Sequence, residues 1–181
     1  LAASLLVLCT CLSIQAQSIR SIAGRLDNGK RLDTLISFDN TKKSAYLPLS
    51  IIKGQYPGLI YTLVAGVHGY EYPPIIAIQE LLNEIDVKKL HGSLIILPIA
   101  NIASFYGRSP FVNPIDNKNL NTAFPGSASG SITEKIAHWI TKEIIPASDV
   151  FIDIHGGDAN EDLLSFICYY DNKDEQTKSA R

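Results

Sequence analysis

Several features that point to particular classes of protein are missing from this sequence. It contains no Met and three Cys, and its formal net charge of -2 gives no electrostatic reason to expect a nucleic-acid partner. It has no Gly-rich phosphate loop and no Ser-His-Asp order, which argues against NTPases and serine hydrolases. With 181 residues, 46% of them hydrophobic and 19% charged, the chain is typical of one globular domain.

The first residues have the character of a secretory signal. Residues 1–14 (LAASLLVLCTCLSI) are apolar and uncharged, but this run is shorter than the ~20 apolar residues that span a bilayer. Because the chain starts without Met, we expect residues 1–16 to be a truncated signal peptide that is cleaved near Ala16. The mature protein, residues 17–181, would then be exported to the periplasm or secreted, with no stable membrane insertion. The alternative for this run is a buried N-terminal helix.

The last part of the chain holds one cysteine and a polar end. Cys168 would be the only thiol left after signal removal, so the mature chain could form no internal disulfide. Its surroundings, SFICYY, predict a small residue within a strand. The polar end, DNKDEQTKSAR, stops without closing an element, and we therefore expect a fragment of a longer domain.

Buried strands alternate with helices in the middle of the chain. Continuous apolar runs predict strands, and apolar positions three or four residues apart predict helices. This alternation favours a parallel sheet that is covered on both faces. Before it, residues 18–58 are expected to form short strands and turns. The other predicted elements are strands at 59–66, 92–99, 149–155 and, as a fourth candidate, 163–170; a helix with Pro73 and Pro74 in its first turn; a polar loop at 100–130; and a helix between a Ser131-x-x-Glu134 capping box and Pro146.

Three residues with metal-ligand chemistry follow two of these strands. His68 and Glu71 come just after the strand at 59–66, and His155 ends the strand at 149–155. Ligands of open α/β sheets bind beyond the carboxyl ends of the strands, so these side chains are expected to meet. Two His and one Glu are the protein ligands of hydrolytic zinc sites that keep one position open for water. The alternative is a capping Glu with hydrogen-bonded structural His residues.

The motif around His68 and Glu71, GVHGYEYPP, resembles the G-x-H-G-x-E zinc signature of the succinylglutamate desuccinylase/aspartoacylase family, which is related to the zinc carboxypeptidases. The resemblance continues in the family's order through LPIANIASFYGRSP, DNKNLNTAFPG, GSITEKIAHWI and DVFIDIHGGD. It implies an α/β fold, namely a three-layer sandwich with a mostly parallel, mixed central sheet like that of the zinc carboxypeptidases. Residues 17–181 would be the N-terminal part of a single zinc hydrolase catalytic domain, incomplete at the C-terminus.

The resemblance also implies roles for individual residues. His68, Glu71 and His155 match the ligands of one zinc ion per chain. Arg108, in YGRSP, matches the arginine that polarises the scissile carbonyl and stabilises its oxyanion. Asn121 matches the asparagine that helps to hold the substrate carboxylate.

Two nearby residues are interpreted as supporting groups. In the family pattern, Asn119 occupies the position of a group that orients a ligand histidine, which the resemblance implies to be His68, through its free ring nitrogen. Asp153 precedes His155 by two residues and is interpreted as a structural residue that belongs to the opposite face of its strand.

Two departures from the family pattern bear on catalysis and specificity. Thr122 stands where the family has an arginine that clamps the substrate carboxylate, and a threonine hydroxyl offers only one neutral donor. The general-base glutamate of the family is expected downstream of residue 181. Glu161 is close to His155 in sequence, but nothing marks it as a replacement.

The predicted function is that of a zinc-dependent amidohydrolase. It would cleave the amide bond, or an ester bond, of an N-acyl amino acid or related small substrate. One alternative is a zinc carboxypeptidase that acts on peptides or cell-wall stems, and another is a zinc-bearing binding protein without turnover. The expected partner is a small N-acyl amino acid or a short peptide and no nucleic acid; the acyl group, the amine and the oligomeric state stay open.

Overall fold

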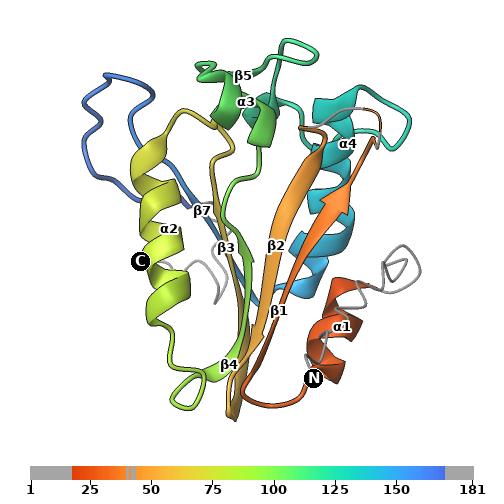
Figure 1. Cartoon of the computed structure of the whole chain (residues 1–181), viewed down its shortest axis with the longest axis vertical. Helices are drawn as coiled ribbons and strands as arrows, with labels where there is room; N and C mark the ends of the chain where they lie inside the picture. Colours follow the sequence, from red (N-terminus) through yellow and green to blue (C-terminus); the bar gives the residue numbers. More distant parts are fainter. Residues whose placement is uncertain (1–17, 40, 42–43, 170–181) are drawn as a thin grey trace, which may run out of the picture.

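The structure, a computed structural model, describes residues 18–39, 41 and 44–169, and its centre is a five-stranded sheet (Figure 1). In sheet order the strands are β1 (Lys30–Ser37), β2 (Tyr46–Lys53), β4 (His91–Leu97), β3 (Tyr56–Ala65) and β7 (Val150–Ile154). β3 pairs with β4 and β7 in parallel, whereas β2 pairs with β1 and β4 in antiparallel orientation. The carboxyl ends of β4, β3 and β7 therefore lie at the same edge of the sheet.

The sheet is mixed, as expected, but the strands that the structure describes are not mostly parallel. Two of its four strand pairs are antiparallel. Residues 18–58 account for the difference, because they supply β1 and β2, and β2 is antiparallel both to β1, which precedes it in the chain, and to β4. Antiparallel neighbours need only a short connection, whereas parallel neighbours need a crossover of a dozen or more residues. The same segment forms a helix, α1 (Ile19–Arg25), where only short strands and turns were expected.

Helices cover both faces of the sheet, and each face has its own apolar core (Figure 1). Neighbouring residues of one strand alternate between the two cores: Ile51 belongs to the first core and Ile52 to the second. One face is covered by α1 and by α4 (Ile132–Trp139), which continues into η3 (Ile140–Ile144) and η4 (Ile145–Ala147); the other face is covered by α2 (Tyr72–Glu84) and α3 (Ile102–Gly107).

Two helices begin where the sequence predicts. α2 has Pro73 and Pro74 in its first turn and buries Ile75. At the start of α4, the Glu134 carboxylate accepts a hydrogen bond of 2.8 Å from the backbone N–H of Ser131. The apolar stripe of α4 and its continuation η3 is buried as expected, at Ile132, Ile136, Ile140 and Ile144.

The predicted loop at 100–130 contains short elements as well as irregular chain. After α3, the two-residue strands β5 (Val112–Asn113) and β6 (Lys118–Asn119) pair with each other and lead into a 3₁₀ turn, η2 (Leu120–Thr122). Between the two strands, the Asp116 carboxylate accepts hydrogen bonds from the backbone N–H and the hydroxyl of Thr133, at 2.9 and 2.7 Å. These bonds attach the loop to the first turn of α4.

Residues 163–169, where a fourth strand was a candidate, form no strand. A strand needs a partner for its backbone N–H and C=O groups, and none of the described strands pairs with this segment. Cys168 is consequently exposed and not part of a strand. The predicted signal peptide lies outside the described residues. Among the helices that the structure does describe, none has the length and apolar character needed to cross a membrane.

Candidate metal centre

The three predicted ligand residues meet at the carboxyl edge of the sheet. His68 and Glu71 lie in the turn between β3 and α2, and His155 directly follows β7. β3 and β7 are parallel neighbours whose last residues, Ala65 and Ile154, are paired. One ligand atom from each of the three side chains falls within 4.8 Å of the other two. Strand pairing therefore brings together residues that are far apart in the sequence.

The turn that carries His68 and Glu71 depends on two glycines. Gly66 has a φ of 67°, in the left-handed region that side chains disfavour. A Cβ atom at Gly69 would collide with the backbone of Phe105 and Asn101, so α3 packs against the turn more closely than any other residue would allow. These contacts explain why His68 and Glu71 are only 7% and 4% exposed.

Glu71 joins the two histidines. The Nδ1 atom of His68 lies 2.8 Å from Oε1 of Glu71, and Nδ1 of His155 lies 3.1 Å from Oε2. The backbone N–H of Gly156 also donates to Oε2, at 3.1 Å. A tetrahedral zinc ion with bonds of ~2.0–2.1 Å separates its ligand atoms by ~3.3 Å. The spacing of these nitrogen and oxygen atoms, and their chemistry, thus fit a zinc ion.

The outer nitrogen of each ring faces a hydrogen-bond acceptor. Nε2 of His68 lies 3.1 Å from Oδ1 of Asn119, and Nε2 of His155 lies 3.0 Å from Oδ2 of Asp153. An amide oxygen and a carboxylate only accept, so Nε2 carries a hydrogen on both rings. When each ring is neutral, its only proton is on Nε2. Both Nδ1 atoms are then free to bind a metal beside Glu71.

The position of Asp153 corrects its interpretation as a structural residue on the opposite face of the strand. Successive side chains of a strand alternate between faces, so residues two apart share one face. Asp153 and His155 therefore point the same way, and the carboxylate holds the imidazole. The D-x-H spacing in a predicted strand was the signal that could have assigned this role.

The charges of the group support one another. Burial alone would raise the pKa of Glu71, but hydrogen bonds from His155, His68 and the N–H of Gly156 lower that pKa to about 2. Hydrogen bonds to Asp153 and Glu71 raise the pKa of His155 to about 10. The bond to Glu71 is also the main cause that raises the pKa of His68. Each ring therefore holds a proton more tightly beside this carboxylate, and a metal ion that binds at Nδ1 must displace any proton there.

The other predicted site residues lie on exposed chain. Arg108 is the C-cap of α3 with a φ of 47°, and among the described residues its side chain makes no hydrogen bond or ion pair. The backbone N–H of Asn121 donates to Oδ1 of Asn119 at 2.8 Å, and the Thr122 hydroxyl donates to the Asn119 carbonyl at 3.2 Å. Glu161 accepts from the N–H of Asp158 at 3.0 Å and so closes a turn.

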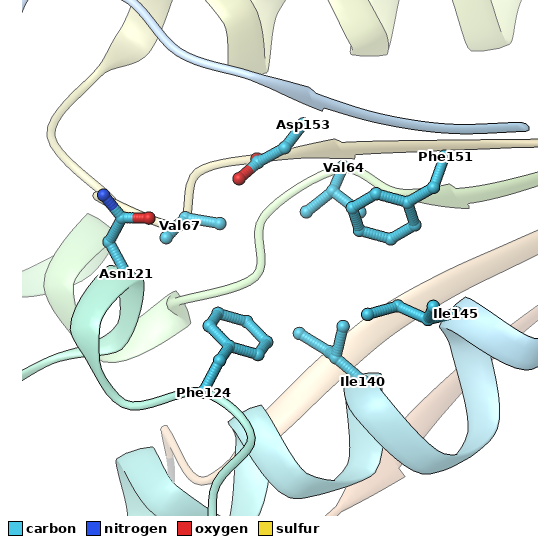
Figure 2. Close-up of a pocket in the computed structure, with 8 residues that line it drawn as sticks. All are labelled: Val64, Val67, Asn121, Phe124, Ile140, Ile145, Phe151 and Asp153. Carbon is cyan, nitrogen blue, oxygen red and sulfur yellow. The ribbon is translucent and has the colours of Figure 1, made fainter. Parts of the chain in front are cut away.

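An apolar cavity of about 160 Å³ lies beside the group, between the sheet and the α4 side of the molecule (Figure 2). Asn121 and Asp153 are its polar lining residues. Figure 2 shows Asn121 at the left and Asp153 at the top, with Val67 between them, Phe124 and Ile140 at the bottom, and Phe151 and Ile145 at the right. The apolar lining consists of Val64, Val67, Phe124, Ile140, Ile145 and Phe151.

The fold and the donor set define an α/β protein with a metal-binding centre. The sequence profile of the succinylglutamate desuccinylase/aspartoacylase catalytic domain matches residues 57–181. The chain therefore belongs to the succinylglutamate desuccinylase/aspartoacylase family.

Relatives with named activities and solved structures agree with this assignment. The N-alpha-acetyl-L-2,4-diaminobutyric acid deacetylase of Halomonas elongata is 36% identical over 137 residues, which are 74% of this chain and 39% of that protein. The succinylglutamate desuccinylase/aspartoacylase structure from Rhodobacter sphaeroides has a TM-score of 0.65 at 25% identity, over 74% of this chain and 42% of that one. The product-bound structure of the ectoine utilization protein of Ruegeria pomeroyi has a TM-score of 0.62 at 31% identity, over 73% of this chain and 41% of that one. The chain thus spans about two fifths of these relatives.

Proposed function

We propose that this chain carries the metal centre of a zinc-dependent deacylase that hydrolyses the amide bond of a small N-acyl amino acid. The observation that carries the proposal is the meeting of His68, Glu71 and His155, each ring held by an acceptor at its outer nitrogen. Family membership and the deacetylase relative, whose name gives N-acetyl-diaminobutyrate as its substrate, support this substrate class. We also propose the complete fold to be a three-layer sandwich of the zinc carboxypeptidase type.

His68, Glu71 and His155 would hold one zinc ion per chain. Bound zinc would polarise a carbonyl oxygen and lower the pKa of a water molecule to ~7. Asn119 and Asp153 keep the two rings oriented, and the backbone N–H of Gly156 orients Glu71. Because these bonds exist before substrate arrives, the ligand atoms need little reorganisation.

The residues on the neighbouring loop would bind the substrate. Arg108, as a fixed cation, would stabilise negative charge on the carbonyl oxygen, and Asn121 would hold the substrate carboxylate. Thr122 offers that carboxylate one neutral donor instead of an arginine fork, so we expect a weak preference for a free acid over its neutral amide.

The general base in this proposal is the glutamate expected downstream of residue 181. Within the described chain, the only carboxylates in contact with the group are Glu71 itself and Asp153, which His155 engages. Glu161 instead closes a turn with Asp158. Export to the periplasm or secretion is part of the proposal and is motivated by the apolar N-terminal run.

The test uses the full-length protein and a panel of N-acetyl amino acids that includes N-acetyl-diaminobutyrate and matched pairs of free acid and neutral amide. We expect about one zinc per chain and hydrolysis of at least one acid of the panel, both lost on removal of zinc and restored by its return. Full zinc occupancy without hydrolysis of any acyl amino acid would favour the binding-protein alternative. Cleavage of peptides alone would favour the carboxypeptidase.

A further inference from the structure

The segment that carries Arg108 has an unusual backbone. Arg108 and Phe111 have φ values of 47° and 59°, in the left-handed region, although neither is glycine. This conformation is uncommon for bulky side chains and persists only where surrounding contacts hold it. The segment 108–111 must therefore be fixed by residues outside it.

One end of the segment is attached to the turn that holds His68 and Glu71. Ser104 is fully buried, and its hydroxyl donates to the backbone carbonyl of Ser109 at 2.7 Å. The same hydroxyl accepts a hydrogen bond of 3.1 Å from the N–H of Gly69. One buried oxygen thus connects the arginine segment to the buried side of the metal centre.

The other end of the segment is attached to the loop that follows His155. Oδ2 of Asp158 accepts a hydrogen bond of 2.9 Å from the backbone N–H of Phe111. The loop is itself closed, because Asp158 and Glu161 exchange hydrogen bonds of 3.0 Å. The ring of Phe111 then lies edge-on to the ring of His68, with 5.5 Å between their centroids.

Stability alone explains Asp158 poorly. The residue is 2% exposed, and its Oδ1 atom is buried with no hydrogen-bond partner in the described part of the chain. Burying a carboxylate with an unsatisfied oxygen costs free energy, and such a group in a folded protein calls for an explanation. The other oxygen, Oδ2 of Asp158, suggests an explanation, because it binds the backbone N–H of Phe111, a residue in a disfavoured conformation.

We propose that Asp158 is a positioning residue that sets the place of Arg108 relative to the metal ligands. It acts through the N–H of Phe111, and the backbone of residues 108–111 transmits the constraint. Together, Ser104 and Asp158 attach this segment to the loops of both ligand strands. The proposal rests on the proposed function for the role of Arg108, but the hydrogen bond itself can be tested without activity.

The first test measures amide hydrogen exchange in the full-length protein, in a peptide covering residues 108–112. Asp158→Ala removes the acceptor, so we expect faster exchange there and little change in α2. Asp158→Asn keeps an oxygen acceptor of the same shape, and we expect it to retain the protection. Unchanged exchange in Asp158→Ala would overturn the proposal. Equal loss in both variants would mean that the charge, and not the hydrogen bond, is needed, and would overturn it as well.

The second test is a double-mutant cycle with Arg108→Ala, read as kcat/KM at equal zinc content. A displacement of about 1 Å can cost 10²-fold in rate, so we expect Asp158→Ala to lower kcat/KM by ~10- to 100-fold and Asp158→Asn by less than about threefold. In the Arg108→Ala background, Asp158→Ala should cost less than about threefold. If the double variant lost kcat/KM by the product of the two single losses, Asp158 would act independently of Arg108. That result would assign Asp158 a merely structural role and overturn the proposal. An inactive parent would contradict the proposed function, and hydrogen exchange would still decide the role of Asp158.

Discussion

The metal centre has two halves that are built in different ways. His68 and Glu71 sit in a glycine-dependent turn between a central strand and a helix, and they are 7% and 4% exposed. His155 follows β7, which among the described strands pairs with β3 alone, and the neighbouring Phe151 and Ile152 are 38% and 42% exposed. Within the described residues, local chain geometry and packing therefore hold the first half, whereas the pairing of one strand delivers the second.

The two histidines also differ in the group that accepts a hydrogen bond from the outer ring nitrogen. The outer nitrogen of the buried His68 faces a neutral amide, Asn119, and its ring also packs against Phe111. The more exposed His155 faces a carboxylate, Asp153. A charge-assisted hydrogen bond is roughly twice as strong as a neutral one, so the half with less packing has the stronger bond. Orientation of a ligand can thus come from packing or from charge.

The largest expected effect is the loss of zinc when either half is removed. His68→Ala and His155→Ala should each abolish stoichiometric zinc binding, because each leaves only two of the three protein ligands. Elemental analysis after dialysis measures this, with His91→Ala as a control for an exposed histidine outside the site. If His155→Ala kept full occupancy while His68→Ala lost it, the buried half alone would bind the metal.

The next largest effect is a difference in stability between alanine substitutions at Gly69, in the first half, and at Gly156, in the second. A Cβ at Gly69 collides with backbone atoms, whereas a Cβ at Gly156 lies 3.0 Å from the Pro74 ring. We expect Gly69→Ala to lower the free energy of unfolding by ~1–3 kcal/mol and Gly156→Ala by less, since a ring can shift more easily than a backbone. Urea unfolding measures both. Gly24→Ala is the control, because nothing lies within 4 Å of a Cβ there. A larger cost at Gly156 would refute the idea that His155 has the looser surroundings.

The acceptors of the outer nitrogens should differ in their effect on zinc affinity. Loss of such an acceptor typically weakens metal binding by 10- to 100-fold. We expect Asp153→Ala to approach ~100-fold and Asn119→Ala to stay near ~10-fold, because burial and the ring of Phe111 still hold His68. Competition with a chelator measures the dissociation constants. Equal losses would show that packing does not replace the hydrogen bond of His68.

The smallest effect is expected outside both halves, at the start of α4. Hydrogen bonds from Lys118 and from the Ser131 backbone lower the pKa of the partly exposed Glu134 from 4.5 to about 2. A lowered carboxyl pKa stabilises the fold above the unfolded value, so this contribution should fade as the pH falls from about 4.5 through about 2. In Glu134→Gln, the loss of stability with acid should be slightly shallower across this window. Unfolding midpoints measured between pH 5 and 2 test this, and identical slopes would speak against a role of the Glu134 charge.

Local patterns predicted the first half of the site and its supporting elements. The apolar run of β3, the glycines, His68, Glu71 and the prolines of α2 are contiguous, so their burial and turn chemistry can be read from neighbours in the sequence. The same holds for α4, whose capping glutamate and isoleucine stripe lie within a few turns. Asn119 was assigned to His68 only through the family resemblance, and the structure places its amide oxygen 3.1 Å from that ring.

The sequence by itself determined which residues could bind a metal, that residues 149–155 contain a strand, and where the helices α2 and α4 begin. The expected burial of that strand is wrong for the described chain, in which Phe151 and Ile152 of β7 are 38% and 42% exposed. Only the tertiary structure decided that β7 lies next to β3, that Asp153 holds His155, and that residues 163–169 form no strand with the described chain. His155 and Glu71 are 84 positions apart, and their contact depends on which strands become neighbours. Apolar periodicity indicates the type of an element, but it does not give the partners that cover it, because partners depend on the packing of the whole chain.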